Sequence, residues 1–234
     1  MLSKNLVRTP HFMNGALCLS MSFFAMSCAT SPTGAYNNLM KEKRAYHDSL
    51  TLSQKVNPNA DAPAVNDYKT MDLSDDDYVV LLPEKAGNAS YAKVIDFQAT
   101  APNMWIQVLS FASKPFGFTP VRVIVPRVEL FSKKQKTPLP LVARPITQRG
   151  VGWVRPAGAL FSFEARALVT GDTYRIVITS DNLHAGEKAG NIPNYAAAGI
   201  GGAAGLGVML IGYDTYYSPI GKFELEILDK EPKK

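Results

Sequence analysis

The residues that could perform chemistry are few and far apart in this chain of 234 residues. His184 is followed by Glu187 at a spacing that suits a metal ion or proton transfer, but the surrounding sequence, Asn-Leu-His-Ala-Gly-Glu-Lys, is typical of a solvated loop. His47 lies apart from both. The sequence contains no metalloprotease motif, no nucleophile elbow, no zinc-binding spacing and no phosphate-binding loop. We therefore expect no enzyme, no cofactor and no metal; an enzyme would need a site built from scattered Asp, Glu, Tyr and Arg.

Two short charged runs have simple explanations. Asp75–Asp77 precedes a strand pattern, and without the spacing of a calcium loop it indicates a solvated turn rather than a calcium site. Lys133–Lys136 indicates the tip of a hairpin, with lipid headgroup contact as the alternative. The formal net charge of +5 is spread along the chain, so we expect no nucleic-acid partner.

Aromatic residues are the better candidates for ligand contact. Trp153 lies beside glycines in the sequence QRGVGWVRP, which also holds Arg149 and Arg155. Tyr216 and Tyr217 form a second aromatic pair. Aromatic faces with polar groups at their edges suit sugar rings. We expect these five residues to contact a glycan or a protein partner, and ordinary packing is the alternative for Trp153.

The N-terminus has the pattern of a signal peptide over residues 1–27. Lys4 and Arg8 precede an uncharged apolar run that is too short to cross a membrane comfortably. Small residues then lead to Cys28, which resembles the cleavage box of bacterial lipoproteins. We expect an acyl anchor on Cys28, and Ala29, in place of aspartate, favours the outer membrane of a Gram-negative bacterium. A plain secreted protein or an uncleaved anchor is the alternative.

The remaining chain alternates apolar and polar residues with period two. The pattern is clear over residues 91–99, 104–111, 173–180 and 220–228, with turn residues between the runs. Trp105 falls within such a run, so we expect it in the core. The sequence predicts a mainly β fold, an antiparallel, jelly-roll-like β-sandwich over residues 68–230.

The segment before this domain, residues 28–67, predicts a tether. A loose helical pattern over residues 35–56 indicates a short helix, and residues 57–70 are rich in Pro, Asn and Ala, as in a linker. The globular part is therefore expected to start near Tyr68, some 40 residues after the anchor.

A Gly-rich apolar segment, residues 195–213, interrupts the β pattern as an insertion. Gly201 and Gly205 have the spacing that lets apolar helices approach closely, and Leu206 and Met209 add apolar bulk beside them. Three interpretations stand: a packed helical insertion, an element that inserts in a membrane or joins protomers, and a loop.

Several stretches resemble the maltose-operon periplasmic protein family. They are residues 67–77, 94–111, 174–188, 191–195 and 218–228, which resemble its entry segment, opening strand pair and closing strands. The Gly-rich segment departs from the family pattern. The resemblance implies a periplasmic, non-enzymatic accessory to carbohydrate uptake and carries no catalytic residue with it.

The expected function is that of a lipid-anchored, non-catalytic protein of the cell envelope that assists maltodextrin uptake or binding. Its expected partners are the membrane, a maltodextrin or other glycan, and an outer-membrane protein. The alternative is a structural lipoprotein that oligomerises or contacts membrane through its Gly-rich segment.

Overall fold

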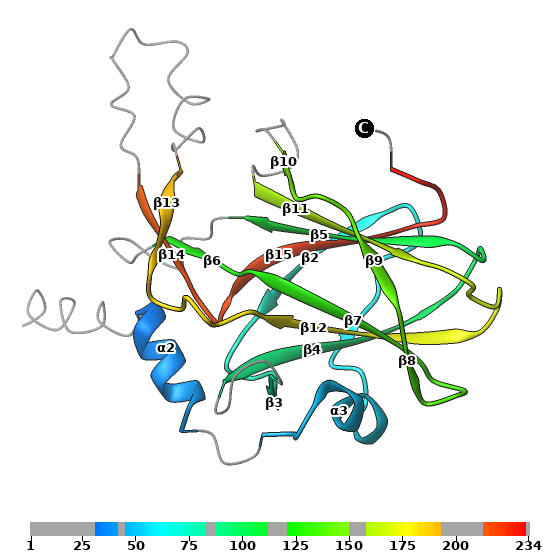
Figure 1. Cartoon of the computed structure of the whole chain (residues 1–234), viewed down its shortest axis with the longest axis horizontal. Coiled ribbons are helices and arrows are strands. Elements are labelled where there is room, and N and C mark those ends of the chain that lie inside the picture. Colours follow the sequence, from blue (N-terminus) through cyan, green and yellow to red (C-terminus); the bar gives the residue numbers. More distant parts are fainter. Residues whose placement is uncertain are drawn as a thin grey trace, which may run out of the picture. The chain divides into compact units, whose positions relative to one another are not determined.

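A computed structural model describes residues 31–41, 45–82, 88–111, 121–149, 158–192 and 213–232. From Ser31 onward the chain forms one compact unit (Figure 1). Its described residues hold two helices, α2 (Pro32–Leu39) and α3 (Ser49–Lys55), and strands that belong to three sheets.

Sheet A has the strand order β1-β4-β12-β7-β8, and β3 pairs with β4 beside β1. Its strands are β1 (Ala60–Asp61), β3 (Tyr78–Leu81), β4 (Ala89–Gln98), β7 (Pro126–Ser132), β8 (Thr137–Leu139) and β12 (Thr173–Ser180).

Sheet B has the order β10-β11-β5-β15-β2, and β9 also pairs with β11. Its strands are β2 (Tyr68–Leu73), β5 (Met104–Phe111), β9 (Leu141–Ala143), β10 (Thr147–Arg149), β11 (Gly158–Ala165) and β15 (Gly221–Leu228). A small sheet C has the order β13-β14-β6, with β6 (Val121–Val123), β13 (Lys188–Ile192) and β14 (Tyr213–Tyr217).

The alternation in the sequence places one face of sheet A against one face of sheet B. Ile176 and Ile178 of β12 belong to the same buried cluster as Phe223, Leu225 and Ile227 of β15. Each large apolar side chain buried in this way contributes about 1.5–3 kcal/mol. The predicted mainly β, sandwich-type fold is confirmed. Pairing is mostly antiparallel, but β1 runs parallel to β4 and β6 parallel to β14.

The outer face of sheet A is also buried, because α3 covers it. Leu52 of α3 packs with Val94, Phe131 and Val177 in a second, smaller cluster. Asp48 caps the helix by accepting a hydrogen bond from the Thr51 N–H at 2.6 Å.

The predicted tether is wrong in one respect: its helices are docked on the sandwich. Leu39 of α2 is 1% exposed and lies in the main core, and Leu52 is fully buried. Residues 60–61, predicted as linker, form β1 against β4. The compact unit therefore begins with α2 and not near Tyr68, because the apolar faces of these helices have a partner that their local sequence cannot reveal.

Candidate functional site

The sandwich is open along one edge, between β7 and the strands β9 and β10. β8 pairs only with residues 130–132 of β7, so the first half of β7 has a strand partner on one side only within the described residues. In sheet B, β9 and β10 both pair with β11, and the Arg144 N–H still donates to the Ser162 carbonyl at 2.9 Å, but residues 145–146 between the two strands have no partner residue in the ladder among the described residues. Pro145 has no N–H to donate, so it interrupts this edge strand.

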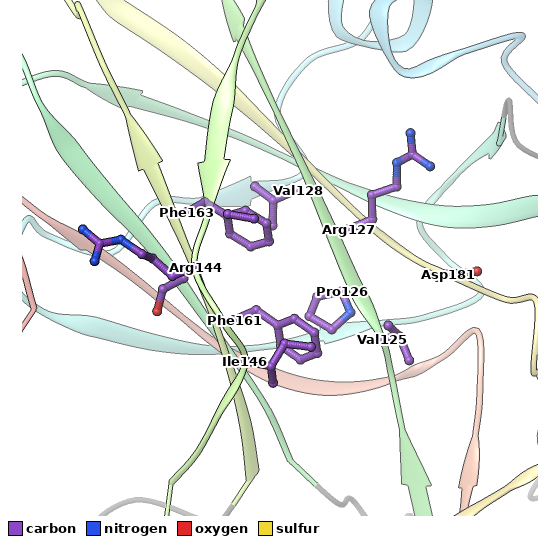
Figure 2. Close-up of a pocket in the computed structure, with 11 residues that line it drawn as sticks. Val125, Pro126, Arg127, Val128, Arg144, Ile146, Phe161, Phe163 and Asp181 are labelled. Carbon is purple, nitrogen blue, oxygen red and sulfur yellow. The ribbon is translucent and has the colours of Figure 1, made fainter. Parts of the chain in front are cut away.

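A slot of about 340 Å³ lies at this edge, a volume within the range of small-molecule sites. Its apolar lining comes from both sheets. In Figure 2 the ring of Phe163 lies beside Val128, and the ring of Phe161 lies with Ile146 and Pro126. Two phenylalanines two residues apart on β11 point to the same side because strand side chains alternate.

The charged groups beside the slot turn away from its centre. The guanidinium groups of Arg127 and Arg144 point away from the rings on opposite sides (Figure 2). Arg127 pairs with Glu129 at 3.5 Å. Arg144 stacks on the ring of Trp105, with 4.6 Å from Cζ to the ring centroid, and pairs with Glu231 at 3.0 Å.

The remaining polar lining is already hydrogen-bonded. The Ser162 hydroxyl accepts a hydrogen bond from Gln107 Nε2 at 2.9 Å, and the Asp181 N–H donates to the Val125 carbonyl at 2.8 Å. The centre of the slot therefore offers apolar and aromatic surface. This suits the binding of a ligand face, and among the residues that the structure describes no acid, base or nucleophile lies at the rings.

Two carboxyl groups at sheet A have shifted pKa values and form ion pairs within the fold: Asp77 in the turn before β3 and Asp96 on β4. Burial raises the pKa of Asp77, whose side chain meets Lys93 at 2.5 Å. Asp75 and Asp76 are exposed as a solvated turn requires, but Asp77 is turned inward. Asp96 lies under α3 and binds Arg175.

The basic run Lys133–Lys136 forms the turn between β7 and β8, as predicted for a hairpin tip.

The predicted aromatic site is not assembled at the slot. Tyr216 and Tyr217 lie on β14 in sheet C, and the ring of Tyr217 is 6.2 Å from that of His184. The backbone of Arg149 ends β10 and pairs with Gly158. None of these residues lines the slot. Six other predicted contact residues and the anchor lie outside the described residues: Trp153, Arg155, Gly201, Gly205, Leu206, Met209 and Cys28.

His184 and Glu187 pair at 3.0 Å with both side chains exposed, as expected in a loop. Within the part of the chain that the structure describes, no group of three or more His, Cys, Asp or Glu residues could hold a metal ion. A search of the described residues likewise finds no helix with the length and apolarity needed to cross a membrane.

The sequence analysis missed the residues of the slot. Phe161 and Phe163 read as ordinary core residues of a strand, and only the prolines at 138, 140 and 145 signalled that the neighbouring edge is broken. Comparison of the chain with protein-family models, with curated proteins and with solved structures finds no match. The resemblance to the maltose-operon periplasmic proteins therefore stays a prediction from the sequence.

Proposed function

We propose that this chain is a non-catalytic, lipid-anchored protein of the cell envelope that binds a maltodextrin or similar glycan as an accessory to carbohydrate uptake. The observation that supports it is the slot, whose centre presents two phenylalanine rings and, within the described ranges of the chain, no reactive group. The apolar C–H faces of sugar rings pack on aromatic side chains, while their hydroxyl groups face water at the open edge.

Trp105 gives this proposal a reporter. Arg144 lines the slot and at the same time covers the Trp105 ring, so a ligand that moves Arg144 changes the surroundings of that tryptophan. With Trp153 replaced by phenylalanine, Trp105 is the sole tryptophan of the chain. Maltodextrins are titrated into the chain starting at residue 29, and the expected result is a saturable change in emission.

A matched pair of variants locates the binding. Ile146 in the slot is 61% exposed, and Val169, outside the slot lining, is 56% exposed. Replacing either residue by aspartate should therefore lower the free energy of unfolding by a similar, small amount. Ile146→Asp should abolish the saturable change and Val169→Asp should keep it. Binding that survives Ile146→Asp would place the glycan elsewhere, and a flat titration in all variants would count against a glycan that contacts Arg144 at the slot.

The anchor is tested separately. Cys28→Ala removes the only thiol that an acyl chain could occupy after cleavage of the predicted signal peptide. The expected result is a shift from the membrane fraction to the soluble fraction. A variant that stays firmly membrane-bound would contradict the acyl anchor and leave the glycan proposal standing.

A second candidate function is structural, with the Gly-rich segment contacting a membrane or another copy of the chain. It is favoured by the pairing of β13 with β14, in which Ile192, three residues before the segment, pairs directly with Tyr213, its last residue. Replacing Gly201 and Gly205 by leucine should then change the elution volume or membrane retention. Unchanged values in both measurements would count against this function.

A further inference from the structure

Helix α2 is fixed to the end of the sandwich where β12 leads into β13. Ala35 and Leu39 of α2 are 4% and 1% exposed, so the helix is part of the core. Its first turn touches the 183–187 turn: a Cβ added to Gly186 would lie 2.4 Å from Thr33 Oγ1. This contact places the start of α2 at that end.

The chain between this end and the predicted anchor is very short. Three peptide steps separate Cys28 from Ser31, which caps α2 by accepting a hydrogen bond from the Gly34 N–H at 3.0 Å. At 3.8 Å per step the two Cα atoms are at most about 11 Å apart, whatever path the chain takes. An acyl group on Cys28 therefore holds the start of α2 close to the lipid headgroups.

The opposite end of the sandwich lies beyond that reach. β12 runs from Thr173 to Ser180 along sheet A, and at about 3.3 Å per residue it spans about 23 Å. Val169 lies before the start of β12, and the 183–187 turn follows its end (Figure 1). The two loops thus mark opposite ends of one strand.

The surface at the α2 end mixes one apolar side chain with polar ones. Leu183 is an apolar side chain that is 42% exposed there, beside the exposed side chains of His184 and Glu187. β13 and β14 continue from the same turn, since the Gly186 N–H donates to the Tyr217 carbonyl at 2.8 Å. Single exposed apolar side chains are ordinary on a protein surface, and Val169 at the opposite end is 56% exposed, so the orientation of the domain on the membrane rests on the short distance between Cys28 and α2.

We propose that this end, formed by Ser31, Thr33 and the 183–187 turn, is the face that rests on the lipid bilayer. The proposal builds on the acyl anchor of the proposed function and adds to it a fixed orientation. The sandwich then contacts the membrane directly, and its 166–172 loop is the part farthest from the bilayer. No long tether separates the domain from the lipid.

Two labelled variants test the orientation in the full-length lipoprotein reconstituted in phosphatidylcholine vesicles. His184→Cys and Val169→Cys place a thiol at exposed positions of the two ends, and an acylated Cys28 offers no thiol of its own. A fluorophore on each thiol is quenched with lipids that carry a nitroxide on the headgroup. The expected quenching is at least threefold stronger at residue 184, and Glu187→Cys serves as a second label at that end.

The possible failures are distinct. One failure concerns the orientation alone. It is the case in which the wild-type protein has no reactive thiol and binds the vesicles, but the label at residue 169 is quenched as strongly as the label at residue 184, or more strongly. Wild-type protein that reacts with the thiol probe and stays out of the vesicle fraction would overturn the anchor, and with it the orientation.

Discussion

Arg175 of β12 binds Asp96 of β4 at two points, with Nε 2.6 Å from Oδ1 and Nη2 3.0 Å from Oδ2. Its third nitrogen, Nη1, donates to the backbone carbonyls of Ser53 and Val56, each at 2.6 Å. These carbonyls belong to the last turn and the end of α3, where the helix leaves its acceptors unpaired. One arginine, 5% exposed, therefore joins α3 to sheet A.

Arg175→Met should lower the free energy of unfolding by about 3 kcal/mol. The substitution leaves the Asp96 carboxylate and two helix carbonyls without their main donor, and breaking a buried pair on one side is costly. Urea unfolding measures the loss.

Lys133→Met is the matched control for Arg175→Met. Lys133 meets the same carboxylate at 2.8 Å, but its side chain is 45% exposed, so its loss should cost under about 1 kcal/mol. If both variants lost the same free energy of unfolding, the burial of Arg175 and its bonds to α3 would add nothing to the stability beyond an exposed ion pair.

Asp96 should make the protein sensitive to acid. Burial acts to raise its pKa, but the hydrogen bonds from Arg175 and Lys133 outweigh burial and lower the pKa below 3.8. A carboxyl group with a lowered folded pKa stabilises the fold fully above its unfolded pKa and loses that contribution as the pH falls through the folded value. The difference in unfolding free energy between wild type and Asp96→Asn should stay constant from about pH 7 to 5 and shrink below about pH 4.

Asp77 provides a comparison of opposite sign. Burial is the main cause that raises its pKa above 3.8, despite the hydrogen bond from Lys93. A raised folded pKa means that the fold is favoured by protonation, so this group's contribution is complete below pH 3.8 and is lost as the pH rises through the raised value. The stability of wild type relative to Asp77→Asn should therefore increase as the pH falls through that window. Parallel curves for the two asparagine variants in urea unfolding would contradict both assignments.

The long strands could be predicted because most of the alternate residues along each strand are apolar and buried. The patterns over residues 91–99, 104–111 and 220–228 correspond to β4, β5 and β15, each of which puts alternate residues into the main core. Period two identifies a strand and its inner face, and it does not identify the partner of that face. The strand order, and the fact that β7 of sheet A lies opposite β11 of sheet B, could be learned only from the structure.

The slot and the docked helices could not be predicted for the same reason. β8, β9 and β10 are three residues each, too short to show a period, and Pro138 within β8 and Pro140 and Pro145 beside β9 are typical of a loop. Leu39 and Leu52 lie in helices of eight and seven residues that hold few apolar residues, and nothing local distinguishes a helix that packs on the sandwich from one in a tether. Both features arise from contacts between segments distant in sequence.

Arg144→Ala should uncover Trp105. The guanidinium lies 4.6 Å from the ring centroid on the outer face of sheet B, and a cation over an indole ring contributes about 1 kcal/mol. In a Trp153→Phe background, the emission should shift to longer wavelength and acrylamide should quench it more strongly. Arg166→Ala is the control, since Arg166 pairs with Glu164 at 2.7 Å. A red shift of equal size in the control would contradict the stacking.

Gly158→Ala and Gly171→Ala should destabilise the fold for different reasons. At Gly158, where β11 passes β5, an added Cβ would lie 2.2 Å from the backbone oxygen of Ser110, so the strands must separate at a cost of about 2–3 kcal/mol. Gly171 has open space around it but a φ of +90°, which costs a residue with a Cβ about 1–2 kcal/mol.

Asparagine separates the two causes. It tolerates positive φ better than alanine, so Gly171→Asn should recover part of the loss, whereas Gly158→Asn should be at least as harmful as Gly158→Ala, because the obstacle there is backbone. Thermal and urea unfolding of the four variants measure the losses. If Gly158→Asn were more stable than Gly158→Ala, β11 would be free to move away from β5. The close approach of these two strands would then not explain the glycine at residue 158.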